Sequence, residues 1–310
     1  MFGYLIKRVA NALIVLWVVT TITFILMHSI PGGPFTAEKK IPPAVQANIE
    51  ARYKLNDPLI IQYKDYMINL AHGDLGPSFK YLGRSVNEII EENVPVSFEL
   101  GIESVILSII VGVPAGIWAA VRRNRWQDRV INFITTLGIA VPGFVLAALL
   151  VDILAIKLGL LPANMWRDWT SRILPVLALS AMPMAFITRL TRSSMLDVLG
   201  QDFIKTAKAK GLSQFNILFK HALPNAVIPV VTYLGPLTAG ILTGSFVIEN
   251  IFAIPGLGKY FVTSIYNRDY TVILGITIFY SAIVIFMNML VDLIYPLLDP
   301  RIKLGDKEGE

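Results

Sequence analysis

The stretch Gly200–Pro224, GQDFIKTAKAKGLSQFNILFKHALP, is a polar segment between two long apolar runs. Asp202 is a candidate N-cap for a helix over Phe203–Lys210, because its carboxylate can accept a hydrogen bond from the first free amides. Gly211 can adopt the left-handed conformation that closes a helix, which predicts a positive φ at this residue. The first half of the segment is therefore predicted to be a short helix that stops at a glycine.

The second half carries the signals of another helix. Ser213 is a candidate N-cap, and Pro224 is predicted to end the helix. Leu212 directly follows the glycine, and the residue at this position often makes a hydrophobic contact with the last turn of the preceding helix. The apolar residues of the second helix are spaced to share one face: Phe215, Leu218, Phe219 and Ala222. Two capped helices with an apolar face are more than a connector between membrane spans needs, and they favour a docking element.

The spacing of Ala207, Gly211 and Leu223-Pro224 resembles the EAA loop of ABC importer permeases. The chain departs from that pattern at Lys205, Thr206 and His221, which replace Glu, Ala and Ile. The form TAKAKGL followed by HALPNA resembles the peptide and nickel branch. In this family the loop forms coupling helices that sit in a groove on the cytoplasmic ATPase. The resemblance implies an ATPase-coupling role for Asp202, Thr206, Ala207, Gly211, Leu212, Phe215, Leu223 and Pro224.

A simpler alternative is an amphipathic hairpin on the lipid surface, aided by Lys205, Lys208 and Lys210. A hairpin of that kind would not require Gly and Leu-Pro at these spacings.

The composition indicates a membrane protein. Of 310 residues, 55% are hydrophobic and 16% are charged. The net charge of +5 fits basic cytoplasmic loops better than nucleic-acid binding. The chain has no cysteine, which excludes disulfides and thiolate sites.

Six apolar runs predict six membrane spans. Val9–Ile30 has no charged residue and is long enough to cross a bilayer, which takes roughly 20 residues. Pro31–Pro34 is predicted to end this span. Its length, and the lack of a small-residue cleavage site, argue against a signal peptide. The other runs are Val96–Val121, Val130–Ile156, Ile173–Leu190, Ala226–Ile248 and Thr271–Leu298.

Residues 31–95 form a predicted extracytoplasmic segment. Asp57 is a candidate cap, with Pro58 at the first position of a helix that reaches about Leu70. Pro43–Lys54 is a second candidate helix, and Gly73–Ser78 is a turn-rich loop. With so small a core, this segment is expected to pack on the membrane part. The predicted division is residues 1–30, 31–95, a permease core over 96–298 that contains the loop 200–224, and a tail over 299–310.

The distribution of Lys and Arg predicts the orientation. Both termini lie on one side if there are six spans. The loops of that side hold fifteen Lys and Arg, against five in the short loops of the other side. Both termini and the 200–224 loop are therefore predicted to be cytoplasmic.

Several residues within the apolar runs are candidates for a pathway or for helix pairing. The carboxylates are Glu99, Glu103, Asp152 and Asp292. Gly240 and Gly244 have the spacing that lets another helix approach closely. Prolines and glycines in the fourth and fifth runs suggest that these spans line a path, although packed spans contain them too.

No catalytic or nucleotide-binding motif is found. The three histidines form no zinc motif. Pro255–Lys259 fails as a phosphate loop, because Ala253 stands where its first glycine belongs and Tyr260 replaces Ser or Thr. The chain is therefore expected to be no enzyme and to bind no cofactor or metal.

Further motifs in order along the chain resemble the peptide branch: Pro31-Gly32, Asn56-Asp57-Pro58, His72-Gly73-Asp74-Leu75-Gly76, Arg189-x-x-Arg192, Ile254-Pro-Gly-Leu-Gly258, Arg268-Asp269-Tyr270 and Asp299-Pro300-Arg301. Pro34-Phe35-Thr36 with Ile41-Pro-Pro43 most resembles the B-type permease of oligopeptide importers.

The resemblance implies an all-α, six-span permease of a bacterial inner membrane that imports oligopeptides. It implies as partners a second permease, two ATPases that hold ATP and Mg, an extracytoplasmic peptide-binding protein and the lipid membrane, but no nucleic acid. Alternatives are a dipeptide, nickel or glutathione permease and, from another class, a stand-alone channel or membrane enzyme.

Overall fold

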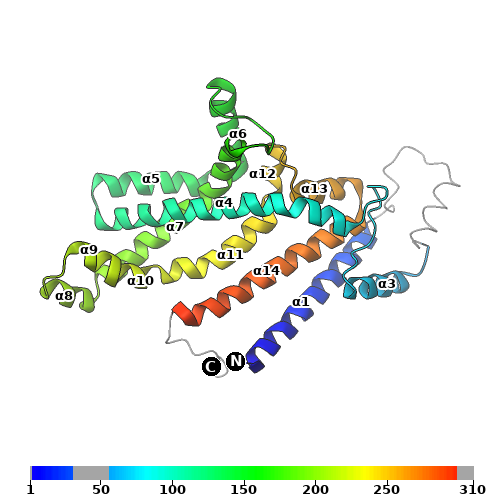
Figure 1. The fold of residues 1–310 in the computed structure, drawn as a ribbon, viewed down its shortest axis with the longest axis horizontal. Helices are drawn as coiled ribbons and strands as arrows, with labels where there is room; N and C mark the ends of the chain where they lie inside the picture. The colour runs from blue at the N-terminus through cyan, green and yellow to red at the C-terminus, as the bar shows by residue number, and fades with distance from the viewer. Residues whose placement is uncertain (1, 31–55, 299–310) are drawn as a thin grey trace. The chain divides into compact units, whose positions relative to one another are not determined.

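The computed structural model describes residues 2–30 and 56–298 (Figure 1). Within these ranges the chain forms helices and one isolated antiparallel bridge, between Pro77 and Ser85, so this part is all-α as predicted. The predicted stop at Pro31–Pro34, the candidate helix Pro43–Lys54 and the tail from Asp299 lie outside the described residues.

The elements follow one another in this order, with η marking π-helices: α1 (Phe2–Ser29), α3 (Leu59–Ala71), α4 (Val86–Val121), α5 (Trp126–Ala140), α6 (Gly143–Leu150), η1 (Val151–Lys157), α7 (Trp169–Leu199), α8 (Asp202–Ala209), α9 (Gln214–Asn216), η2 (Ile217–Ala222), α10 (Leu223–Ala226), α11 (Ile228–Gly244), α12 (Phe246–Ile251), α13 (Leu257–Asn267) and α14 (Tyr270–Leu298).

Four of the described helices, α1, α4, α7 and α14, are each long and apolar enough to cross a membrane. Two bent pairs pass the same test together. Trp126–Ala140 and Gly143–Lys157 meet at 104°, and Gln214–Ala226 and Ile228–Leu242 meet at 47°. If each bent pair is one span, the chain has the six spans that the sequence predicts.

The sharper bend has a local cause. Pro142 disfavours the helical conformation at the residue before it, and Val141 is extended, with φ −87° and ψ 119°. Helix α5 therefore ends at Ala140, and α6 starts afresh after Pro142. The third apolar run is thus two helices rather than one.

Two helices extend well beyond the predicted apolar runs. α4 begins at Val86, so the last ten residues of the predicted extracytoplasmic segment are its first turns. α7 has 31 residues where the apolar run has 18, and Pro175 and Pro183 lie buried inside it. Its start is a capping box between Asp168 and Ser171. Hydrogen bonds from the Thr170 hydroxyl and the Ser171 amide hold the pKa of Asp168 below its usual value.

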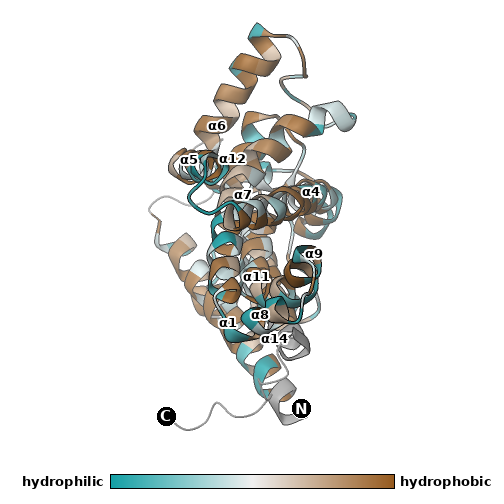
Figure 2. Cartoon of the chain, turned by 90° about the vertical axis from the view of Figure 1, so that its left-hand side faces the viewer, coloured by the Kyte–Doolittle hydropathy of each residue, from teal (hydrophilic) through white to brown (hydrophobic). Residues whose placement is uncertain are grey.

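Residues 97–254 and 284–298 form one compact unit, in which α7 is the central helix. It packs against α5, α6, α10, α11, α12 and η2. Gly112 and Gly116 bring α4 close to it, since a Cβ at Gly116 would lie 2.6 Å from the Thr188 carbonyl oxygen. Gly138 does the same for α5, with the Ala185 Cβ at 3.0 Å. Small residues thus let two helices approach α7 closely. Figure 2 shows mostly hydrophobic residues along α6 and hydrophilic ones in α8.

Residues 2–96 and 255–283 form the second compact unit. Its core joins both chain segments, and its buried members are Val86, Ile89, Ile90, Leu257, Val272 and Ile276. Leu75 and Tyr81, from the predicted extracytoplasmic segment, pack against this core. Burial raises the pKa of the Tyr81 hydroxyl. The expectation that this segment packs on membrane helices is confirmed for its described part.

The predicted start of α3 is wrong by one residue. Pro58 is the N-cap, with φ −53° and ψ 139°, and the Asp57 carboxylate accepts no capping hydrogen bond. The Asp57 carbonyl oxygen instead accepts a hydrogen bond of 2.8 Å from the Gln62 amide. The predicted helix itself is confirmed, and Tyr63 attaches it to α1 through a hydrogen bond of 2.7 Å with Thr21.

Candidate functional site

The predicted helix stop at Gly211 is confirmed. Its φ is +76°, in the left-handed region. The Gly211 amide donates to the Lys208 carbonyl oxygen at 3.0 Å, and the Leu212 amide donates to the Ala207 carbonyl oxygen at 3.3 Å. This pair of bonds is a Schellman motif, which satisfies the last carbonyl groups of α8. The hydrophobic contact predicted for Leu212 stays a prediction, and this side chain is 38% exposed.

The predicted N-cap of α8 is wrong. Gln201 occupies that position in extended conformation, and Asp202 is the first residue of the helix. The Asp202 carboxylate pairs with Lys205 at 2.8 Å, and both side chains are exposed. The Thr206 hydroxyl donates to the Asp202 carbonyl oxygen at 3.1 Å. A negative charge in the first turn still favours the helix.

The second helix starts as predicted and continues differently. The Ser213 hydroxyl accepts a hydrogen bond of 3.3 Å from the Asn216 amide, so the predicted N-cap is confirmed. After one α-helical turn, however, Ile217–Ala222 forms the π-helix η2. The prediction that Pro224 ends the helix is wrong, because Pro224 lies in the first turn of α10. The backbone N–H groups of a first helical turn have no carbonyl partner within the helix, so a proline there removes no hydrogen bond.

The π-helix also divides the predicted apolar face. Its i→i+5 hydrogen bonds wind more residues into each turn, so residues with α-helical spacing no longer align. Ala222 is buried and Leu218 is half-buried, whereas Phe215 and Phe219 are exposed. The prediction of one shared face is therefore wrong.

A buried cluster holds α8 and η2 against the ends of α7 and α4. Ile204 and Ala207 come from α8, and Ile217 and Ala222 come from η2. They pack with Met195 of α7, Ala120 of α4 and Ala226 of α10. The two short helices and the end of α7 thus share one buried cluster.

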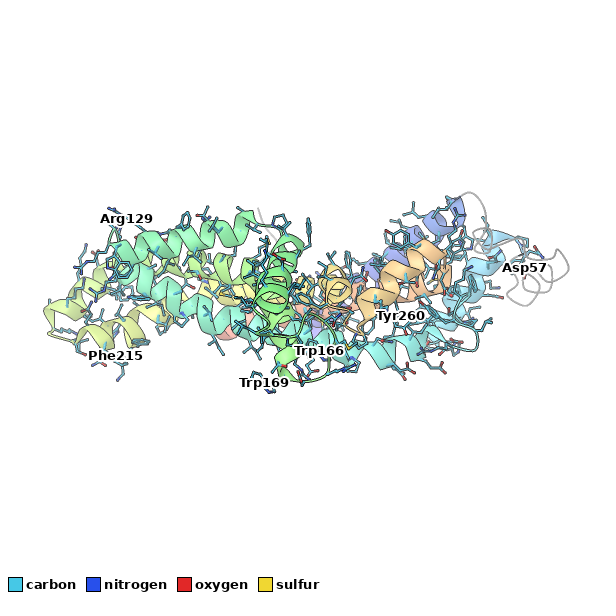
Figure 3. The ribbon with its side chains drawn as sticks, turned by 90° about the horizontal axis from the view of Figure 1, so that it is seen from above. Asp57, Arg129, Trp166, Trp169, Phe215 and Tyr260 are labelled. Atoms are coloured by element: carbon cyan, nitrogen blue, oxygen red, sulfur yellow. The ribbon has the colours of Figure 1, made fainter. Side chains whose placement is uncertain are left out.

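Several apolar side chains of this segment are exposed, among charged ones such as Lys205, Lys208 and Lys220. Phe215 is 66% exposed (Figure 3). Its ring centroid lies 4.5 Å from that of Phe219, and the two rings are tilted by 33°. Phe203 and Leu212 are also exposed. Exposed aromatic side chains of this kind are typical of the anchors of protein interfaces.

Glu99 and Glu103 pair α4 with α7. The Arg172 guanidinium donates to Glu103 at 3.0 Å and also to Glu99. The Trp166 indole donates to Glu99 at 3.1 Å, and its ring lies 4.9 Å from the guanidinium carbon. This geometry supports helix pairing; contact of these carboxylates with a substrate stays a prediction.

The other candidates within the apolar runs are not brought together. Asp152 pairs with Lys157 at 2.6 Å within η1, and both are exposed. A Cβ at Gly240 would have no heavy atom within 4 Å, so no described part of this chain makes the close approach predicted there. The side chain of Asp292 and position 244 lie outside the described side chains.

Two features of the site were missed in the sequence. Gly112-x-x-x-Gly116 is a small-xxx-small motif, readable from spacing, and it is the pair that contacts α7. Asp128 is buried and forms two hydrogen bonds with Arg192, at 2.6 and 2.9 Å. No local sequence pattern predicts the Asp128–Arg192 pair, because the two residues lie 64 positions apart.

Comparisons with known proteins agree with this architecture. Residues 112–304 match the family model "Binding-protein-dependent transport system inner membrane component", and residues 1–100 match the model of its N-terminal part. The dipeptide transport system permease protein DppB of Bacillus subtilis is 54% identical over 99% of this chain and 100% of its own length. The oligopeptide transport system permease protein OppB of Salmonella typhimurium is 46% identical over 98% of this chain and 100% of its own length.

A solved structure of the MetNI methionine ABC transporter, in an inward-facing conformation, has a similar fold. Its TM-score is 0.59 at 18% identity, and the match covers 68% of this chain and 96% of the other. At this identity the likeness concerns the fold alone. The matched family models show that the chain belongs to the family of inner membrane components of binding-protein-dependent transport systems.

Proposed function

We propose that this chain is the permease subunit of an ATP-driven importer of peptides. The observation that supports this most directly is its similarity, over nearly the whole chain, to peptide permeases of two classes. The dipeptide permease is 54% identical and the oligopeptide permease 46% identical. The chain would form half of the translocation pathway, and a second permease would form the other half.

The segment from α8 to η2 is the proposed docking site for a cytoplasmic ATPase. The exposed Phe203, Leu212, Phe215 and Phe219 would contact the ATPase groove. The buried residues behind them would transmit its movement to α7. ATP and Mg would bind to the two partner ATPases and not to this chain. In this arrangement both termini and the α8–η2 segment face the cytoplasm.

The proposed cycle assigns the transport step to these movements. ATP-driven closure of the ATPases would shift α8 and η2, and the spans would switch a central cavity from inward-facing to outward-facing. An extracytoplasmic binding protein would then release peptide into that cavity.

Uptake of labelled peptides by cells that lack this gene tests the proposal. Restoring the gene should restore uptake of at least some di- to hexapeptides, and the length series would separate a dipeptide importer from an oligopeptide importer. Uptake should stop when ATP is depleted, and two ATPase subunits should copurify with the chain. Saturable uptake that persists without any ATPase would contradict the proposal and favour a channel.

A further inference from the structure

The carboxylate of Asp128, in the first turn of α5, is fully used as an acceptor. Arg192 Nε donates to Oδ1 at 2.6 Å, and Arg192 Nη2 donates to Oδ2 at 2.9 Å. The Asn124 amide donates to Oδ2 at 2.9 Å, and the Asn132 side chain donates to Oδ1 at 2.7 Å. A carboxylate has about four lone-pair sites, so each has a donor. Asp128 is only 3% exposed.

The partner arginine lies next to the candidate docking segment. Arg192 precedes Met195 by one helical turn, and Met195 belongs to the cluster that holds α8 and η2. One turn earlier, Arg189 donates to the hydroxyl groups of Thr136, at 2.6 Å, and Thr135, at 3.3 Å. The part of α7 that carries the docking segment is therefore bound to α5 at two successive turns.

Polar contacts between these helices have particular weight in a membrane. The hydrophobic effect provides little attraction between two helices in lipid, because lipid tails are as apolar as the side chains. Phe133 and Ile134 of α5 are exposed on the unit's surface. A two-pronged contact between arginine and carboxylate fixes the orientation of the partners as well as their distance. The Asp128–Arg192 pair can thus prevent α5 from sliding along α7 or rotating against it.

We propose that Asp128 and Arg192 are positioning residues that make α5 move together with α7 when the docking segment moves. The proposal rests on the proposed docking of an ATPase at α8 and η2. Displacement of α8 or η2 would move α7 through the Met195 cluster. The ion pair would carry the displacement to α5, whereas α6 packs on α7 directly.

Spin labels test this coupling directly, because the chain has no cysteine of its own. Val130→Cys on α5 and Met182→Cys on α7 place labels at exposed positions of the two helices. In the complete importer, the two labels should give one narrow distribution of distances, and this distribution should be the same with and without ATP. Arg192→Lys keeps the positive charge but removes the guanidinium that forms two hydrogen bonds with Asp128. In this background the distribution of label distances should broaden and should change with ATP. A distance that changes with ATP in the wild type, or that the Lys variant leaves unaltered, would overturn the proposal.

Transport provides a second measurement. In Arg192→Lys importers reconstituted in vesicles, peptide taken up per ATP hydrolysed should fall by between about twofold and thirtyfold, as for other residues along coupling networks. ATP hydrolysis itself should persist, which a general loss of folding would not permit. Asp128→Asn combined with Arg192→Lys should be no worse than the more severe single change, because the two residues act as a unit.

Glu92→Gln is the matched control, because Glu92 pairs with Arg84 at an exposed position in the other compact unit. It should leave the ratio of uptake to hydrolysis unchanged, and an equal fall in this control would contradict the assignment. Failure of the wild-type chain to bind any ATPase would instead reject the proposed function.

Discussion

The Ser78 hydroxyl donates a hydrogen bond of 2.5 Å to the Asp269 carboxylate, although the two residues lie 191 positions apart. The same carboxylate is fully buried and accepts from the Phe79 amide at 3.2 Å, the Lys80 amide at 3.3 Å and the Thr271 hydroxyl at 3.0 Å. One side chain therefore holds the loop after α3 against the first turn of α14.

Asp269→Asn should loosen that loop. An asparagine has one acceptor oxygen where aspartate has two, so some of these donors would stay buried without a partner, at a cost of about 1–3 kcal/mol. Hydrogen exchange of the Phe79 and Lys80 amides should become faster by the corresponding factor. Amides of α8, in the other compact unit, serve as the internal control and should be unaffected. Unchanged exchange at Phe79 and Lys80 would show that the carboxylate does not fix the loop.

Gly211→Val should reduce transport without preventing membrane insertion. A Cβ at Gly211 would meet no heavy atom within 4 Å, so the penalty comes from the φ of +76° alone, about 1–3 kcal/mol of backbone strain. Peptide uptake and ATP hydrolysis stimulated by the permease should fall together, because the angle between α8 and the following helix changes.

Gly211→Asn is the matched control and should be milder, since Asn tolerates the left-handed region best after Gly. Gly211→Ala should lie between the Asn and Val variants. Wild-type uptake by the Val variant would show that the helix stop is not needed for coupling.

Gly116→Ala should destabilise the chain more than Gly240→Ala does. The added Cβ at Gly116 would lie 2.6 Å from a backbone oxygen of α7, and such overpacking costs about 1–3 kcal/mol. Gly240 faces open space within the described chain, so its change should stay within about 0.5 kcal/mol. Thermal unfolding of the purified chain in detergent measures both. Equal melting temperatures would contradict the close α4–α7 contact.

Thiol labelling tests the orientation of the chain. Ser78 would be a poor position, because its hydroxyl is buried against Asp269, whereas Leu82 is 84% exposed in the same loop. Leu82→Cys should react with an impermeant reagent in intact cells, and Ser213→Cys should react only after permeabilisation. Reaction of Ser213→Cys in intact cells would reverse the orientation and exclude docking of a cytoplasmic ATPase.

Local features of the site could be predicted from the sequence. The left-handed glycine at 211 and the cap at Ser213 depend on neighbouring residues only, and both predictions are confirmed. The π-helix could not be predicted, because it forms where Ile217 and Ala222 both reach the buried cluster. The prediction of Asp202 as the N-cap of α8 is wrong because residue type alone favours Asp at that position, whereas the helix begins at Asp202 and Gln201 is the N-cap.

Features that depend on distant residues were predicted less well. The ends of α7 were missed because polar residues flank its apolar centre: Thr170–Arg172 precede the apolar run, and Thr191–Ser194 follow it. The glycine pair chosen by spacing was Gly240 and Gly244, whereas the close approach within the described chain occurs at Gly112 and Gly116. Spacing identifies glycines that permit contact, and only the fold decides which of them has a neighbour.

Because Ile217–Ala222 is a π-helix, the number of residues in this loop determines the direction in which the exposed side chains before it point. Each residue of an α-helix turns the chain by about 100°. Removing one residue from η2 could restore regular α-helical winding, and Phe215 and Phe219 would then point about a quarter-turn away from their present direction relative to α11. The composition of the exposed surface would be almost unchanged, but a partner would meet a different face. In the proposed docking contact, loop length would therefore contribute to specificity, because a single-residue insertion or deletion would change the angle at which a partner meets Phe215 and Phe219.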